Sequence, residues 1–147
     1  DGALQLDLKF NVNDPHDSFL ISGKLSNFYT EKLNDFLVPN LRTQTTGTIE
    51  QLYFTISGDE YTSSGDMKMR YEDFKFQLLN KERNGVKKVL SFIGNLFVND
   101  RSKADENGFR YGTISVERTQ HKSFFNYLWI NLQDGLVDVL TSNGKKE

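Results

Sequence analysis

The sequence predicts an α+β fold: a curved, largely antiparallel β-sheet with a short crossover helix and two longer amphipathic helices covering it. Three observations lead to this prediction. Several segments alternate strictly between apolar and polar residues, which is the period of a strand with one buried face. Other segments repeat apolar residues at helical spacing. Aromatic residues make up 13% of the 147 residues against two prolines, a composition that favours sheet. This length predicts one domain spanning residues 1–147.

The N-terminal segment predicts a β-hairpin over residues 3–26. Apolar and polar residues alternate from Leu4 to Val12. Pro15 interrupts the pattern because proline has no N–H to donate to a neighbouring strand. The alternation resumes from Phe19 to Leu25, so the two halves are expected to pair.

A second hairpin is predicted over residues 47–71 and organises the middle of the chain. Its two arms carry apolar residues at every second position, and residues 57–61 supply the small and acidic side chains of a turn. After Tyr71 the apolar positions change from odd to even numbers. Either Glu72 and Asp73 form a tight turn into a further strand, or they form a bulge that bends one long strand.

Three segments predict helices. Residues 30–39 have the spacing of a short crossover helix that Pro39 ends. Residues 86–97 place Val86, Val89, Leu90, Ile93 and Phe97 on one side of an amphipathic helix. After a predicted loop at 99–108 and a strand at 109–117, Ser123 is expected to cap a last helix with a wide apolar stripe.

The sequence contains no signature of an enzyme or of a metal or cofactor site. It has no cysteine, and His16 and His121 lack the spacing of metal ligands or of a catalytic base with its nucleophile. The motifs of hydrolases, zinc proteases and nucleotide-binding loops are missing. We therefore predict no catalytic, cofactor-binding or metal-binding residues and a protein that is not an enzyme.

Charge and hydropathy limit the partners. A formal net charge of −2 gives no electrostatic footprint for nucleic acid, and no run of residues approaches the ~18 apolar residues of a membrane span. The apolar faces of the sheet are expected to be ordinary core or the lining of a groove for acyl chains. Periodicity alone leaves both open, because core and lipid make the same demand on side chains.

Several strings of residues carry a family resemblance. They include Gly47-Thr-Ile-Glu-Gln-Leu-Tyr-Phe54, Ser64-Gly-Asp-Met-Lys-Met-Arg-Tyr-Glu-Asp-Phe-Lys-Phe76 and Lys122-Ser-Phe-Phe-Asn-Tyr-Leu-Trp129. With Leu37-x-Pro39 and Gly94-Asn-Leu-Phe-Val98, they resemble the C-terminal AsmA-like region of Bacteroidetes envelope proteins. The resemblance extends from about Leu4 to Leu140.

The resemblance implies a C-terminal module of a longer periplasmic protein that is anchored at the inner membrane, and the first residue, Asp1, agrees with an excised piece. Proteins of the AsmA and TamB group are associated with phospholipid transport or outer-membrane biogenesis. The expected partners are phospholipid acyl chains and the preceding domains of the full-length protein. The alternative is a structural or protein-interaction module with a filled core and no lipid groove. The candidate lipid contacts are Leu52, Phe54, Ile56, Met67, Met69, Phe74, Phe76, Phe125 and Trp129.

Overall fold

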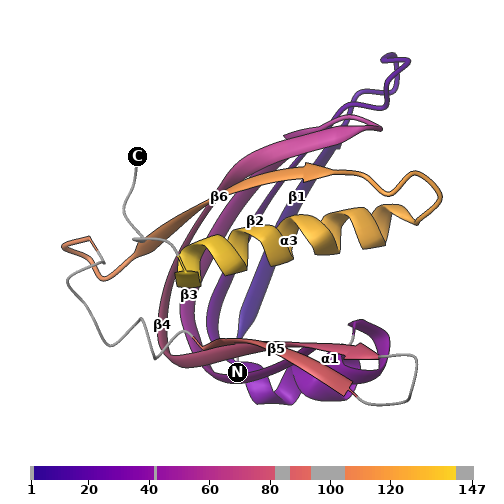
Figure 1. Cartoon of the computed structure of the whole chain (residues 1–147). Coiled ribbons are helices and arrows are strands. Elements are labelled where there is room, and N and C mark those ends of the chain that lie inside the picture. Colours follow the sequence, from indigo (N-terminus) through magenta and orange to yellow (C-terminus); the bar gives the residue numbers. More distant parts are fainter. Residues whose placement is uncertain (1, 42, 82–86, 94–104, 142–147) are drawn as a thin grey trace.

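The computed structural model describes residues 2–41, 43–81, 87–93 and 105–141 (Figure 1). The elements follow one another as β1 (Ala3–Phe10), β2 (Phe19–Tyr29), the 3₁₀ helix η1 (Thr30–Leu33), α1 (Asn34–Leu41), β3 (Thr43–Gly58), β4 (Thr62–Lys81), β5 (Lys87–Ile93), β6 (Arg110–Glu117) and α3 (Phe124–Thr141). The described part of the chain therefore has the α+β composition that the alternating and helical patterns predict.

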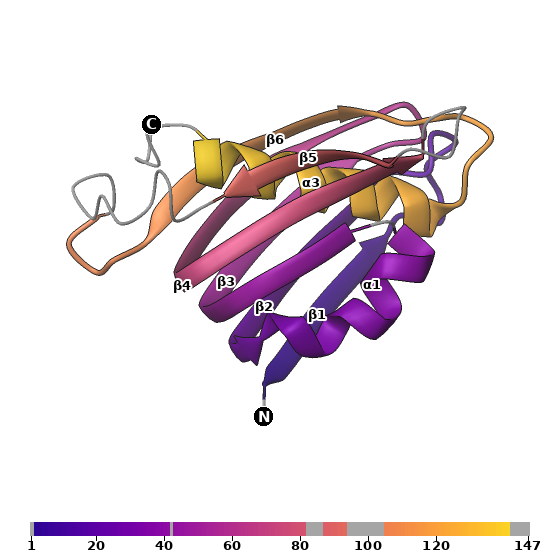
Figure 2. The same ribbon diagram turned by 60° about the horizontal axis from the view of Figure 1, so that its bottom comes forward.

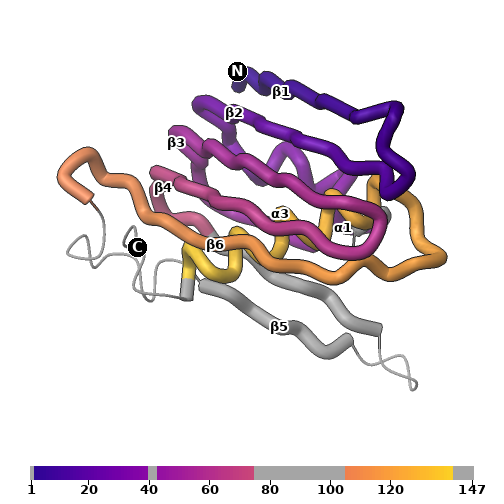
Figure 3. Tube along the Cα trace, turned by 90° about the horizontal axis from the view of Figure 1, so that it is seen from above, coloured from indigo at the N-terminus to yellow at the C-terminus, as the bar shows by residue number. Residues whose placement is uncertain are grey.

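Within the described part of the chain, six strands form one antiparallel sheet in the order β1-β2-β3-β4-β5, and β6 also pairs with β4. The long strand β4 changes partner along its length. Its first part, Thr62–Met69, pairs with β6, and its last part, Lys75–Lys81, pairs with β5. Figure 3 shows β1 to β4 side by side, with β6 following β4. The two predicted hairpins are thus confirmed as β1–β2 and β3–β4.

The sheet bends where β3 and β4 lose their regular register. Register shifts lie between Thr46 and Thr48 and between Ile49 and Gln51 of β3. Gly47 has a φ of 93°, and Asp73 on the facing strand has a φ of 50°. Bulges of this kind increase local twist and bend a strand. Of the two interpretations of the phase change after Tyr71, the bulge in one long strand is the correct one.

The longest helix, α3, lies in the hollow of the bent sheet (Figure 1). Figure 2 views the sheet from the end at which α1 lies. Ser123 caps α3 as predicted, because its Oγ accepts a hydrogen bond from the Asn126 N–H at 3.1 Å. Between the sheet and α3 is a continuous core whose fully buried members include Ile21, Ile56, Met67, Met69, Phe74, Ile114, Tyr127, Val139 and Leu140.

The short crossover helix is present, but it begins and ends differently from the prediction. It starts as the 3₁₀ turn η1, and Pro39 lies inside α1 rather than ending it. The Asn34 side chain attaches this segment to β3. Its Nδ2 donates to the Thr45 carbonyl and its Oδ1 accepts from the Thr45 N–H, each at 2.8 Å.

The prediction of a second long amphipathic helix over residues 86–97 is wrong. Residues 87–93 form the strand β5, which pairs with the last part of β4. Val86 and Phe97 lie outside the described residues. Helical spacing over so short an apolar run does not separate helix from strand. The β-branched Val89 and Ile93 suit a strand, and pairing satisfies the backbone of β4 that extends beyond β6.

Candidate functional site on the concave face

The concave face of the sheet carries apolar side chains on neighbouring strands. Neighbouring strands align their inward side chains in rows, one of which runs Leu8, Ile21, Ile56. Along that row the exposed fraction falls from 48% at Leu8 to 1% at Ile21 and 0% at Ile56. One apolar surface is therefore buried beneath α3 and open at β1.

The candidate lipid contacts on the strands lie in the buried part of this face. Leu52, Phe54, Ile56, Met67, Met69 and Phe74 are each at most 6% exposed and belong to the core packed against α3. On α3 itself, Trp129 is half-buried and Phe125 is 52% exposed. The side chain of Phe76 lies outside the described residues. The structure thus gathers the strand candidates into filled core and leaves Phe125 apart at the surface.

The exposed part of the face is formed by β1. We call it the β1 strip and define it by Leu4, Leu6, Leu8 and Phe10, whose exposed fractions range from 43% to 60%. All four alternate with polar residues and share the side of the sheet on which α3 lies. Contiguous exposed apolar surface of this kind is typical of binding sites.

Aromatic rings mark the boundary between the strip and the core. The Phe10 ring lies 5.6 Å from that of Phe124 and 6.5 Å from that of Phe19. Phe19 in turn packs edge-to-face on Phe124 and on Tyr127. Edge-to-face pairs add to the stabilisation that burial gives. The cluster therefore anchors the N-terminal end of α3 to the strip side of the sheet.

The part of the face that α3 covers also contains polar groups, which form hydrogen bonds within the protein. The Ser63 hydroxyl donates to Asn131 Oδ1 at 2.6 Å, and Asn131 Nδ2 donates to the Tyr127 carbonyl at 2.8 Å. Burial raises the pKa of Tyr71 to about 12, although the neighbouring Arg110 guanidinium favours the ionised phenol. Burial also raises the pKa of Tyr127. Both phenol groups therefore stay neutral at physiological pH.

Arg110 could have been located from the sequence. It is 3% exposed on the concave face, in alternation with Gly112 and Ile114. The period of two already assigns it to the inward side of β6. Sequence reasoning passed over it because a charged residue is rarely fully buried.

A second cluster lies on the opposite, convex face. The Lys68 ammonium is 4.8 Å from the Tyr53 ring centre and 4.9 Å from that of Phe109. Lys24 lies over Tyr53 as well, and Arg70, over Phe109, pairs with Glu50 at 2.7 Å. These cation–π contacts and this ion pair cover the aromatic rings with the stems of basic side chains.

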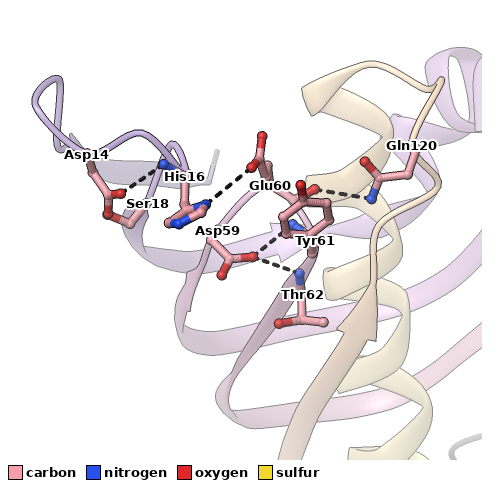
Figure 4. A network of polar contacts seen from close by, with 8 residues as sticks. All are labelled: Asp14, His16, Ser18, Asp59, Glu60, Tyr61, Thr62 and Gln120. Carbon is pink, nitrogen blue, oxygen red and sulfur yellow. Dashed lines mark hydrogen bonds and ion pairs between the residues drawn. The ribbon is translucent and has the colours of Figure 1, made fainter.

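Hydrogen bonds connect the turns at one end of the sheet (Figure 4). The Asp59 carboxylate accepts hydrogen bonds from the N–H groups of Thr62 and Tyr61, and these bonds hold its pKa below the usual range. His16 Nδ1 lies 3.4 Å from Glu60 Oε1, and Gln120 donates to the Glu60 carbonyl. The contacts join the β1–β2 turn, the β3–β4 turn and the loop before α3, and so brace three connections.

These turns do not form a metal centre. Within the described ranges, no three His, Cys, Asp or Glu side chains come close enough to hold an ion. Beside them lies an open polar hollow of about 610 Å³, lined by Ser57, Asp59, Ser63, Glu117 and their neighbours. Among all the residues that the structure describes, no helix is long and apolar enough to cross a membrane.

Comparison with known proteins returns no match: no family model, no curated protein and no solved structure is similar to the chain at a significant level. The arrangement of its own residues is therefore the basis for the functional proposal. It is an apolar concave face, filled beneath α3 and open along β1.

Proposed function

We propose that the chain is a non-enzymatic module of a periplasmic, AsmA-like envelope protein that takes part in phospholipid transport or outer-membrane biogenesis. The proposal assigns acyl-chain contact to the β1 strip. The observation that carries it is the exposure of Leu4, Leu6 and Leu8 on a face that is otherwise core. The resemblance of residues 47–54, 64–76 and 122–129 to the AsmA-like region supports the cellular setting of this proposal.

The strand residues that the sequence suggested as lipid contacts are buried. The proposal therefore assigns acyl-chain contact to the β1 strip instead of to these residues. Met67 and Met69 are at most 1% exposed, so an acyl chain could reach them only if α3 moved away. The β1 strip needs no such movement. Burying a methylene contributes about 0.8 kcal/mol, so a chain that places six methylenes on the strip would gain roughly 5 kcal/mol.

A second function has its own support. The core between the sheet and α3 is filled, as expected of a structural or protein-interaction module without a lipid groove. In that function the strip would contact protein, either preceding domains of the full-length chain or a separate subunit. Both functions use the same residues, so they are separated by what the strip binds.

Photo-crosslinking at single positions of the strip tests the proposal. A photoreactive phenylalanine analogue replaces Leu6, and in the control it replaces Gln5, which points to the other side of the sheet. The protein is expressed in a bacterial periplasm, irradiated and analysed by intact mass. The proposal expects phospholipid adducts at position 6 and few at position 5. Protein adducts alone at position 6 would favour the interaction module, and equal lipid labelling at both positions would refute specific contact.

A charged variant provides the matching loss of function. Leu6→Lys places an ammonium in the strip at a position that is already 43% exposed, so folding should be preserved. The far-ultraviolet circular dichroism and the melting temperature serve as checks. Lipid adducts at Leu8, probed with the same analogue, should fall several-fold in this variant.

A further inference from the structure

The outer edge of β1 presents unpaired backbone groups. The Asn11 N–H donates to the Ser18 carbonyl at 3.1 Å, continuing the register in which Phe10 lies opposite Phe19. Antiparallel strands alternate between residues that bond to the neighbour and residues that face away from it. The odd-numbered residues therefore bond to β2, and Leu4, Leu6, Leu8 and Phe10 direct their N–H and C=O groups outward. Among the described strands, none pairs with this edge.

The edge of β6 is treated differently. The Thr113 N–H donates to Asp138 Oδ2 at 2.6 Å, and the Ser115 N–H donates to Asp134 Oδ2 at 2.8 Å. Two carboxylates of α3, one helical turn apart, thus occupy two outward donors in the middle of β6. Proteins commonly block exposed edges in such ways because an open edge is a template for another strand. This contrast indicates that the edge of β1 is available for pairing.

The charges of β1 are self-complementary in one register. Only even residues can bond across the outer edge, so a second β1 running antiparallel must match even with even and odd with odd. A two-fold axis at Asp7 would place two carboxylates opposite each other. An axis at Lys9 would place two ammonium groups opposite each other. An axis at Leu6 would set Asp7 against Gln5. An axis at Leu8 sets Asp7 of each copy against Lys9 of the other.

We propose that two copies of the chain associate by antiparallel pairing of their β1 edges around a two-fold axis at Leu8. Leu8 then bonds with its own counterpart, and Leu6 bonds with Phe10 of the second copy. Asp7 and Lys9 meet in the non-hydrogen-bonded positions, where facing side chains approach most closely. The contact is isologous, as in most dimers.

The pairing joins the two β1 strips. An axis perpendicular to the sheet keeps the apolar face of both copies on the same side, so Leu6 and Leu8 of one copy lie next to those of the other. One apolar trough results, bordered on each side by an α3 helix. Acyl-chain binding in this trough rests on the proposed function, whereas the pairing of the edges does not.

Charge reversal tests the register. The wild type, Asp7→Lys, Lys9→Asp and the double variant D7K/K9D are compared by sedimentation velocity over a concentration series. Each single reversal opposes two pairs of like charges, and the dimer dissociation constant should rise about tenfold or more. The double variant restores opposite charges and should return to the wild-type constant. A monomeric wild type, or a dimer that is equally stable in all four proteins, would overturn the proposal.

Disulfide cross-linking tests the same register without reversing any charge. The chain contains no cysteine, so any disulfide reports only on introduced residues. A mixture of Asp7→Cys and Lys9→Cys should oxidise to a disulfide-linked dimer, and each variant alone should do so much less. Equal cross-linking of the single variants alone would refute the axis at Leu8. Lipid adducts at Leu6 in the D7K protein show separately whether lipid contact survives when pairing is lost.

Discussion

Two glycines at the crossing of α3 and β6 should respond differently to alanine, Gly112 with a loss of stability and Gly135 without one. At Gly112 an added Cβ would lie 2.8 Å from the Val139 backbone nitrogen and 2.9 Å from the Gly135 carbonyl oxygen. Ordinary contact begins near 3.4 Å, so α3 would have to move by about 0.5 Å. At Gly135 the nearest atoms are side-chain ends, Met67 Cε at 2.9 Å and Ile114 Cγ1 at 3.0 Å, which can turn aside.

The magnitudes follow from these neighbours. Overpacking against a rigid backbone costs about 1–3 kcal/mol, and the lower entropy of the unfolded alanine chain returns about 0.4–1 kcal/mol. Taking the middle of each range, Gly112→Ala should therefore lower the free energy of unfolding by about 1.3 kcal/mol. Gly135→Ala gains about 1 kcal/mol of helix propensity, which offsets the adjustment of the two side chains. That variant should be neutral or slightly stabilised.

Urea denaturation followed by circular dichroism measures both changes. Ser115→Ala is the control on β6, since Ser115 is exposed, and a change within about 0.5 kcal/mol is expected there. The m-value should stay constant in all variants, because none of the substitutions changes the surface that is exposed on unfolding by much. If Gly112→Ala were as stable as the wild type, α3 would not rest on the backbone of β6, and the close-packing argument would fail.

Three further changes test individual contacts. Ser63→Ala removes the donor to buried Asn131 Oδ1 and should lower the free energy of unfolding by about 1–3 kcal/mol in urea denaturation. The pKa of the Asp105 carboxyl is lowered by the Tyr111 hydroxyl and by backbone N–H groups, so its stabilisation is present above the unfolded pKa and lost as pH falls through the folded value. Asp105→Asn should accordingly flatten the decline in melting temperature below about pH 4. Asp138→Ala should cost about 1 kcal/mol and increase light scattering on heating, because it frees a donor on the edge of β6.

Strand prediction succeeded where one face of a strand is buried and the other is wet. The alternation of Phe19–Leu25 and of Leu52–Ile56 corresponds to strands whose inward residues are core. It could not show that Leu4, Leu6 and Leu8 remain exposed, because the same pattern describes a covered strand and an uncovered one. Exposure depends on how far α3 reaches across the sheet, which is a tertiary property.

The incorrect helix over residues 86–97 has a related cause. The apolar spacing of Val89, Leu90 and Ile93 fits one helical face. Over only seven residues, however, the spacing of apolar residues cannot distinguish a helix from a strand. Residues 87–93 form a strand because an edge of β4 is available to them. On this edge β4 pairs with β6 only as far as Met69, and from Lys75 onward it pairs with β5. That edge exists because the bulge near Asp73 bends β4, and the sequence left the bulge and a turn equally open.

The position of α3 along the chain has a consequence for synthesis. Strands β1 to β4 can pair as soon as they leave the ribosome, since their hairpins are local. Their concave face cannot be buried until α3, which follows all six strands, has been made. Ile56, Met67 and Met69 thus stay uncovered by α3 while residues 70–141 are translated. Exposed apolar sheet surface of this kind favours aggregation, and α3 is the element whose synthesis allows the surface to be buried.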